Sequence, residues 1–262
     1  APSEMCIRDR RRLKVKNVIG PYSQKGATLI VVLVMLILIM LVGTWAIRGS
    51  ITSLNIATNA QAQALLTQNS DSVFFSMENK TSDKLNFANM RIGDGILAYV
   101  LRPENKGKEL VFCIRGNTQD NLAGTRLASV IYWEGSTIKN ADMGANGFCK
   151  ADRTTDFISG RKAVLTQVAI RAAENEDWDG LVEVGDIESS KGIGNQKVIL
   201  TATSILPNFS TASISDINSC LKGYTSFVDQ VLNNATVTDC LANKNVPYST
   251  QDMEYTLTQS AS

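Results

Sequence analysis

The chain has 262 residues, 44% of them hydrophobic, and a formal net charge of +1, which allows one medium-sized domain and a long additional segment. It contains no histidine, which excludes Ser–His and Cys–His nucleophilic systems and removes the commonest general base and transition-metal ligand. We therefore do not expect an enzyme.

Residues 1–26 form a basic leader with no apolar core of its own. It has seven Lys and Arg against two acidic residues, so it carries +5 and leaves −4 for the rest of the chain. That mildly acidic remainder gives no sign of binding nucleic acid. The stretch 1–10, APSEMCIRDR, resembles a translated adapter tail, and we exclude it from reasoning about the fold. A basic flank before a membrane span stays in the cytoplasm, so we expect the leader there.

An uncharged run of 21 residues follows at 27–47, ATLIVVLVMLILIMLVGTWAI. As a helix that rises about 1.5 Å per residue, it would be about 31 Å long, which matches the hydrocarbon core of a bilayer. We therefore predict a transmembrane helix over 27–47, with everything after Arg48 on the far side of the membrane.

The sequence stays favourable to a helix as far as about Asn79, with no proline and one glycine, Gly49. Apolar and small residues recur at three- and four-residue steps, which predicts one stripe on an amphipathic helix. The residues of this stripe are Ile47, Ile51, Leu54, Thr58, Ala62 and Leu65. We expect one continuous spine helix over 27–80, half transmembrane and half packed on a globular head formed by 81–262.

From Lys80 onward, short apolar and β-branched runs alternate with turns, which favours an antiparallel sheet. The expected strands are 95–101, 110–116, 126–135, 161–172 and 196–205, the first two as a hairpin. We expect a short amphipathic helix at 216–232 and a polar, frayed end at 241–262. The predicted fold class is α+β.

Five cysteines divide between the two sides of the predicted membrane span: Cys6 lies in the leader, and Cys113, Cys149, Cys220 and Cys240 lie beyond it. An even number in an oxidising compartment favours disulfides, with free buried thiols as the alternative. Four cysteines allow three pairings, of which we prefer the sequential one, Cys113–Cys149 and Cys220–Cys240. In the chain-entropy model, loops of this size stabilise by about 3–4 kcal/mol each.

One segment has the spacing of a calcium-binding loop. Asn175, Asp177, Asp179 and Asp186 occupy its positions 1, 3, 5 and 12, with Gly180 at position 6. Position 1 has Asn in place of Asp, position 12 has Asp in place of Glu, and the flanks look like strand and loop. We expect an acidic surface turn, with a calcium site as the alternative and no other cofactor.

The basic leader, the Lys25-Gly26 pair and the apolar run resemble the class III signal of type IV prepilins and type II secretion pseudopilins. An ordinary secretory signal is cut after its apolar region, whereas here any such site precedes it. The resemblance implies that an inner-membrane prepilin peptidase cuts between Gly26 and Ala27 and methylates Ala27. Lys25 matches the basic residue before the glycine, and Thr28 and Leu29 match the second and third mature positions.

Two positions depart from that family's pattern. The first mature residue is usually Phe and is Ala27 here, and the fifth is usually Glu and is Val31 here. In the family, this Glu neutralises the N-terminal ammonium of a neighbouring subunit, because a charge at membrane depth is costly without a partner. The members that lack it are tip subunits, namely PilX-type minor pilins and GspK-type pseudopilins.

The resemblance therefore implies a PilX-type minor pilin, a structural protein of the tip complex that primes assembly of a type IV pilus. It implies a single pass through the bacterial inner membrane, with the head periplasmic, and later a place in the extracellular pilus. The expected partners are the prepilin peptidase and methylase, other minor pilins, the major pilin and a tip adhesin. The alternatives are a GspK-like tip subunit of a type II secretion pseudopilus and a signal-anchored periplasmic ligand-binding protein.

Overall fold

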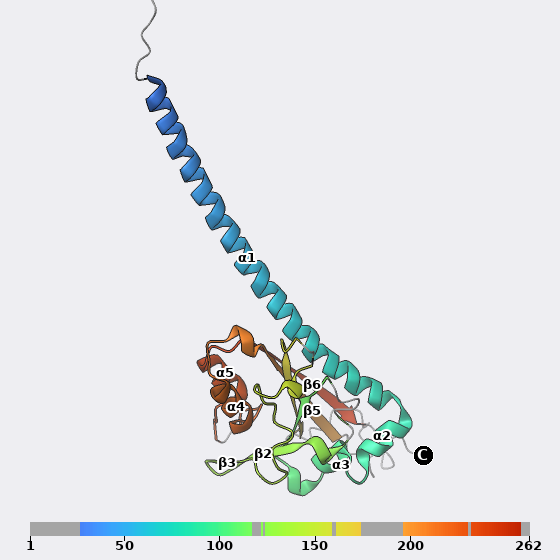
Figure 1. Ribbon diagram of the computed structural model, residues 1–262. Helices are drawn as coiled ribbons and strands as arrows, with labels where there is room; N and C mark the ends of the chain where they lie inside the picture. The colour runs from blue at the N-terminus through green and yellow to red at the C-terminus, as the bar shows by residue number, and fades with distance from the viewer. Residues whose placement is uncertain are drawn as a thin grey trace, which may run out of the picture. The chain divides into compact units, whose positions relative to one another are not determined.

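The computed structural model of the chain describes residues 27–116, 122, 124–158, 161–173, 196–229 and 232–257. The chain divides into two compact units, Ala1–Ile56 and Ala57–Ser262, and we call the described residues of the second unit the head. The longest element is the helix α1 (Ala27–Ser82), which has residues in both units (Figure 1). The prediction of one continuous helix over 27–80 is confirmed.

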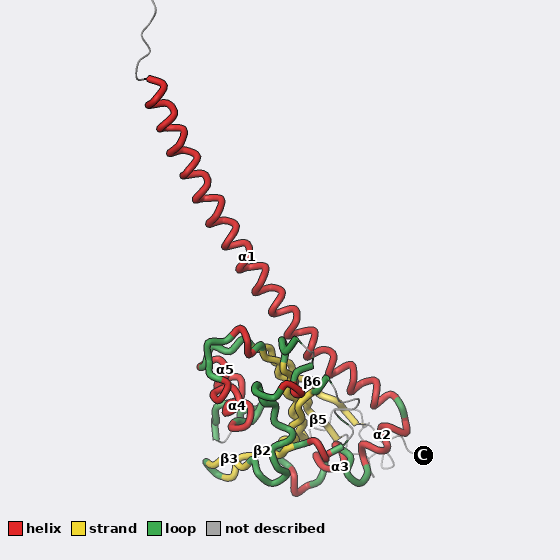
Figure 2. Tube along the Cα trace, viewed as in Figure 1, coloured by secondary structure: helices red, strands yellow, loops and turns green. Residues whose placement is uncertain are grey.

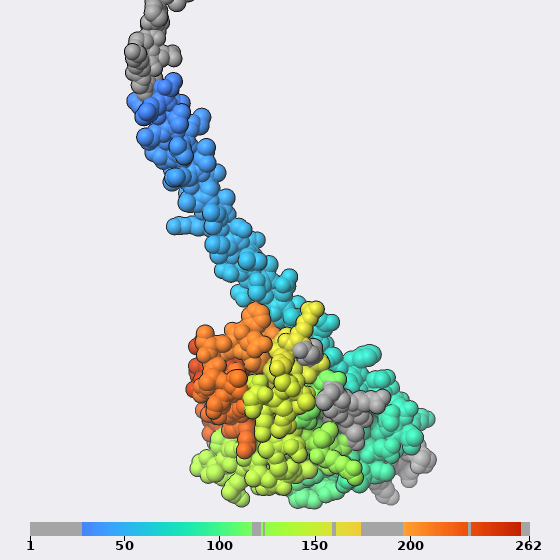
Figure 3. Space-filling model, in the orientation of Figure 1, coloured from blue at the N-terminus to red at the C-terminus, as the bar shows by residue number. Residues whose placement is uncertain are grey.

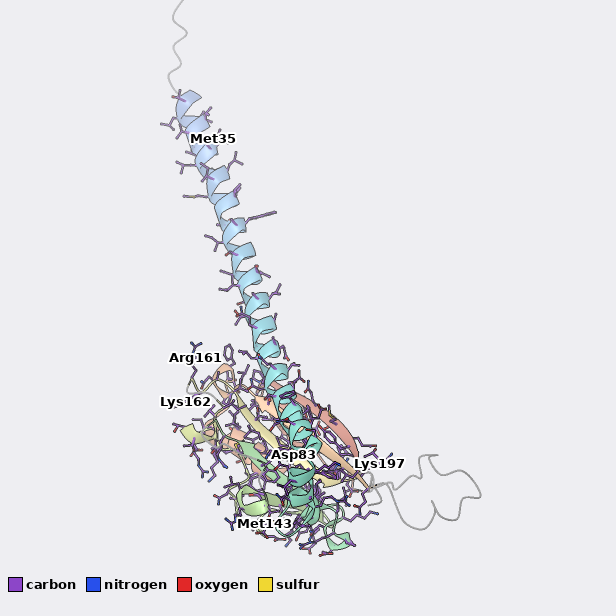
Figure 4. The ribbon with its side chains drawn as sticks, turned by 90° about the vertical axis from the view of Figure 1, so that its right-hand side faces the viewer. Met35, Asp83, Met143, Arg161, Lys162 and Lys197 are labelled. Atoms are coloured by element: carbon purple, nitrogen blue, oxygen red, sulfur yellow. A yellow bond between two sulfur atoms is a disulfide. The ribbon has the colours of Figure 1, made fainter. Side chains whose placement is uncertain are left out.

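The helix α1 ends at Ser82 because the next residue, Asp83, is extended and caps a second helix. Asp83 has an extended backbone, and its carboxylate accepts hydrogen bonds from the N–H groups of Leu85 and Asn86, at 2.9 and 3.0 Å. This cap opens the helix α2 (Lys84–Arg91), and Figure 4 labels Asp83 at the junction. A third, short helix follows as α3 (Ile96–Val100).

The head is built on a six-stranded antiparallel sheet with the order β3-β2-β1-β4-β5-β6. Figure 2 shows its strands in yellow. The strands are β1 (Glu109–Ile114), β2 (Ser129–Glu134), β3 (Thr137–Lys139), β4 (Leu165–Ala172), β5 (Gln196–Ile205) and β6 (Tyr248–Leu257). The prediction of an α+β fold with an antiparallel sheet is thus confirmed.

Two further helices, α4 (Ile214–Gly223) and α5 (Val237–Asn243), are both capped by side-chain oxygens. The Ser213 hydroxyl accepts a hydrogen bond from the Asp216 N–H, and Thr236 and Asp239 form a reciprocal capping box. Short 3₁₀ turns complete the described elements at Pro103–Asn105, Thr125–Leu127, Thr154–Asp156 and Pro207–Phe209.

The sheet has a packed core on each face. On one face, Val73, Phe74 and Met77 of α1 join apolar residues from five strands, for example Phe112 and Leu200. On the other face, α4 and α5 pack over Leu165 of β4 and Ile205 of β5. In the space-filling view, the orange and red residues that include α4 and α5 gather on one side of the head, and the teal residues on another (Figure 3).

The loop between β3 and β4 approaches the sheet closely at Gly147. A Cβ atom there would lie 2.1 Å from the carbonyl oxygen of Val111 and 2.2 Å from the amide nitrogen of Ser129. Both are backbone atoms of the sheet, so only glycine fits this position.

Two predictions from sequence are wrong in the first part of the head. The run 95–101 is the helix α3 and not a strand, and β1 pairs with β2 and β4 rather than forming a hairpin with that run. Ile96, Leu97 and Val100 are its buried residues, and their one- and four-residue spacing suits a helix better than a strand.

Two further predictions are wrong near the C-terminal end. The helix expected over 216–232 stops at Gly223, and the end expected to fray, 241–262, contains the last turn of α5 and the ten-residue strand β6. Alternate side chains of β6 are polar because only one of its faces is covered. The segment is therefore polar on average, and for that reason it was not predicted as a strand. The strand expected at 196–205 is present with those bounds, and those expected at 110–116, 126–135 and 161–172 are present as the shorter strands β1, β2 and β4.

Candidate functional site

The predicted processing signal spans the boundary between the leader and the start of α1. The helix begins at Ala27, and Thr28, Leu29 and Val31 are exposed in its first turns. Lys25 and Gly26 lie outside the described residues. The bond predicted to be cut therefore stands directly before the first described helical residue.

The first part of α1, as far as residue 47, is uncharged and apolar on all sides. Every side chain from position 28 to position 56 is exposed, and the helix includes a window with a mean hydropathy of 3.0. Figure 4 shows these side chains, Met35 among them, standing out around the helix. A helix with no polar face is suited to an apolar surrounding. Within the described residues, α1 is the one helix that is long and apolar enough to cross a membrane.

Two threonine hydroxyls of α1 are satisfied by the helix itself. Thr44 donates a hydrogen bond to the carbonyl oxygen of Leu41 at 2.8 Å, and Thr52 donates to that of Arg48 at 3.0 Å. An unpaired hydroxyl in hydrocarbon costs several kcal/mol. The bond within the helix removes that cost for Thr44, which lies inside the run 27–47.

The second part of α1 belongs to the head and has a buried stripe. The buried residues of this stripe are Leu66, Ser70, Val73, Phe74 and Met77. The predicted stripe is wrong at Ile51, Leu54 and Leu65, which are 54%, 65% and 44% exposed. It is right at Ala62, which packs against the buried Leu66. The cause is that a periodic pattern becomes a buried face only where the sheet covers the helix.

A chain of three hydroxyl groups crosses the contact between α1 and the sheet. Ser70 on α1 lies 2.9 Å from the Oγ of Ser204 on β5, and Ser204 lies 2.8 Å from the Oγ1 of Thr166 on β4. All three residues are fully buried. Because each hydroxyl needs a partner, the chain fixes how α1 sits on β4 and β5.

Both predicted disulfides are present with the sequential pairing. Cys113 on β1 is bonded to Cys149 in the loop after β3, with 4.8 Å between their Cα atoms. Cys220 on α4 is bonded to Cys240 on α5, with 5.5 Å between the Cα atoms. The first bond ties a long loop to the sheet, and the second ties the two covering helices together.

A buried ion pair lies beside the first disulfide. The fully buried carboxylate of Asp156 accepts hydrogen bonds from the Nε of Arg115 at 2.8 Å and from the N–H of Lys150 at 3.0 Å. Arg115 also donates to the carbonyl oxygen of Asn146 at 2.6 Å. These bonds hold the same loop as the Cys113–Cys149 bond, so they support its position rather than form a reactive centre.

A second buried carboxyl group holds the loop after α4. Glu109 on β1 accepts hydrogen bonds from the N–H of Ser226 at 2.8 Å and from its hydroxyl group. Burial raises the pKa of Glu109 to about 7, against the lowering effects of the Ser226 hydrogen bonds and the Arg171 charge. Arg171 in turn lies over the ring of Phe227, 4.4 Å from its centroid.

The possible calcium ligands Asn175, Asp177, Asp179 and Asp186 lie outside the described residues, so this prediction stays open. Within the part of the chain that the structure describes, no group of three or more His, Cys, Asp or Glu side chains is placed to hold a metal ion.

Comparison with known proteins gives no significant match to any family model, curated protein or solved structure. The role of the chain is therefore inferred from α1, from the chemistry of the head and from the sequence signal before Ala27.

Two buried polar groups were missed at the level of sequence. The hydroxyl chain of Ser70, Thr166 and Ser204 has no local signal, because its members come from three distant segments. Glu109 does have a signal in the sequence, because it directly precedes the apolar run LVFCI. A charged residue next to a buried strand needs a polar partner.

Proposed function

We propose that this chain is a PilX-type minor pilin that helps to form the tip complex of a type IV pilus and primes its assembly. The observation that carries the proposal is α1. An all-round apolar part that begins directly after Lys25-Gly26 continues, in the same helix, into residues that form the core of the head. This continuity supports a helix that stays with the mature protein, as in a pilin and unlike a removable signal peptide.

The proposed mechanism is a transfer of α1 between two apolar surroundings. In the inner membrane, the exposed residues of 27–47 contact lipid, and in the filament they contact the same part of neighbouring helices. Helix packing against helices differs little in hydrophobic free energy from helix packing against lipid. Extraction of α1 from the membrane therefore needs an external motor and packing contacts in the filament. It needs no chemical reaction catalysed by this chain.

Val31 supports a place at the tip. In the resembling family, a Glu at this position pairs with the charged N-terminus of another subunit, and Val31 cannot form that pair. A subunit with no subunit ahead of it has no need of the pair, and an unpaired Glu at membrane depth would be costly.

The direct test is mass spectrometry of the N-terminus after expression of the full chain with a prepilin peptidase. The expected product begins at Ala27 and carries one methyl group on its nitrogen. Gly26→Val should block the cut, because a branched side chain replaces the glycine before the bond. Gly20→Val, also in the leader, is the matched control and should be cut normally. An intact leader in the unaltered protein would overturn the proposal.

A second experiment tests the place in the filament. Val31→Glu is expected to lower the number of surface pili in a strain that depends on this chain, because the new charge has no partner at the tip. Val31→Leu is the control and should assemble normally. Normal piliation by Val31→Glu, with the protein present at its usual level, would argue against the tip position.

A further inference from the structure

The two edges of the sheet differ in how well they are protected. At one edge, β3 has only three residues, and Lys139 forms an ion pair with Glu134 on β2, with 3.2 Å between Nζ and Oε2. Short edge strands with charged side chains resist the addition of another strand. The other edge is β6, which has ten residues.

The strand β6 is regular along its whole length. It pairs with β5 at ten consecutive positions, from Tyr248 opposite Ile205 to Leu257 opposite Gln196, without a bulge. It contains no proline and no lysine, the two residues that most often block an edge. Among the described residues, its main chain has no hydrogen-bond partner other than β5.

The two faces of β6 carry different side chains. Met253 and Tyr255 pack against the core that contains Val73 and Met77 of α1. Thr250, Asp252, Glu254 and Thr256 alternate with them and are exposed on the opposite face. Glu254 forms an ion pair with Lys197 on β5, with 3.3 Å between Oε1 and Nζ. Figure 4 labels Lys197 near the start of β5.

These charges disfavour a second copy of the chain as the occupant of the edge. Two β6 strands that pair antiparallel about Asp252 or Met253, with their covered faces on the same side, place Asp252 opposite Asp252 or Glu254 of the other copy. Like charges directly opposite each other destabilise a strand pair. An added strand with basic residues at alternate positions has the reverse effect, since each basic side chain faces a carboxylate of β6.

We propose that the free edge of β6 binds an extended segment of another protein as a seventh strand, with Lys or Arg at alternate positions facing Asp252 and Glu254. Main-chain hydrogen bonds supply the affinity in this mode of binding, and the alternate side chains supply the selectivity. The inference rests on the head alone and holds whether or not the chain is a pilin.

The test uses the full chain in detergent micelles and the peptide TVKVKVT as the probe, with binding followed by fluorescence anisotropy. The expected result is saturable binding that slows amide hydrogen exchange in residues 248–257. The peptide TVEVEVT should bind roughly ten-fold more weakly, because two ion pairs are replaced by repulsion. Equal binding of the two peptides, or protection of β3 instead of β6, would overturn the proposal.

Variants of β6 complete the test. Asp252→Lys/Glu254→Lys should reverse the preference, so that TVEVEVT binds better. The milder Asp252→Asn/Glu254→Gln keeps the shape of the strand and should abolish the preference even if the charge-reversed form folds poorly. Glu104→Lys/Glu134→Lys changes the net charge equally, away from β6, and should leave the preference unchanged. A peptide in which every amide is N-methylated can donate no main-chain hydrogen bond and should not bind, and binding by it would rule out strand addition.

Discussion

Glu109 occupies the first position of β1, between the apolar core of the sheet and the loop that carries Ser226. Its carboxyl group is removed from water, which favours the protonated form. An unfolded glutamate ionises near its ordinary pKa of 4.5, whereas Glu109 in the folded head has a pKa of about 7. Between these values, the folded state holds a proton that the unfolded state has lost.

The stability of the head should therefore fall as the pH rises from about 4.5 to about 7. The contribution of Glu109 is fully present below its unfolded pKa and is lost as the pH passes its folded pKa, with a total loss of about 3 kcal/mol. Urea unfolding at a series of pH values measures this. Glu109→Gln cannot ionise and should remove that slope, while Glu134→Gln, at an exposed position, should retain it.

Ser204 is the middle member of the hydroxyl chain, so its replacement affects two other groups. Ser204→Ala leaves the buried hydroxyls of Ser70 and Thr166 without this partner, and should lower the free energy of unfolding by about 2 kcal/mol. The triple variant Ser70→Ala/Thr166→Val/Ser204→Ala should be more stable than Ser204→Ala alone, since no hydroxyl is then left unpaired. If the triple variant is the less stable one, the hydroxyls do not act as a unit.

Among the elements of the head, α4 and α5 depend most on a covalent bond. They are short, and the Cys220–Cys240 bond joins them over a sequence separation of 20 residues. Cys220→Ala/Cys240→Ala should lower the free energy of unfolding by about 3 kcal/mol, chiefly by releasing the unfolded chain from this loop. Denaturant unfolding under non-reducing conditions measures the loss. A change below about 1 kcal/mol would show that packing alone holds the two helices.

Elements with a strong local pattern were predictable, and those set by distant contacts were not. The run 27–47 and the strand β5 have a composition that is typical of their structure. Of the three possible cysteine pairings, the preferred sequential one is present. The run 95–101 was misjudged because a short apolar run is compatible with a strand or a buried helix until the fold shows which of its residues are buried. The buried face of α1 was misplaced because the position of the sheet decides it.

For the molecule as a whole, the leading question is whether α1 holds it in a membrane. Leu36→Arg places a charge near the middle of the run 27–47, where insertion should cost about 2.5–3.5 kcal/mol more. The expected result is a larger fraction of protein released by alkaline carbonate extraction of membranes. Ile56→Arg, also exposed on α1 but beyond the apolar run, is the control and should stay with the membrane. Equal release of both variants would contradict a span at 27–47.

The candidate processing site shows what sequence can and cannot supply. The proposed roles of Lys25, Gly26 and Val31 depend on the residues around them in the chain, so they can be predicted from the sequence alone. The position of β6 at the edge of the sheet depends on the strand order. That order results from pairing between segments about 50 residues apart, so it is known only from the folded head.

The two disulfides differ in their access to solvent, and this sets an order for their reduction. Cys113 and Cys149 are 2% and 1% exposed, so no thiolate can reach their bond without opening the core. In the other bond, Cys220 is fully buried but Cys240 is only partly buried, so this bond is the less enclosed of the two. Exchange requires direct contact between the attacking thiolate and a sulfur atom. A mild reductant should therefore free α4 and α5 from each other first, while the loop bonded to β1 stays attached until the sheet itself opens.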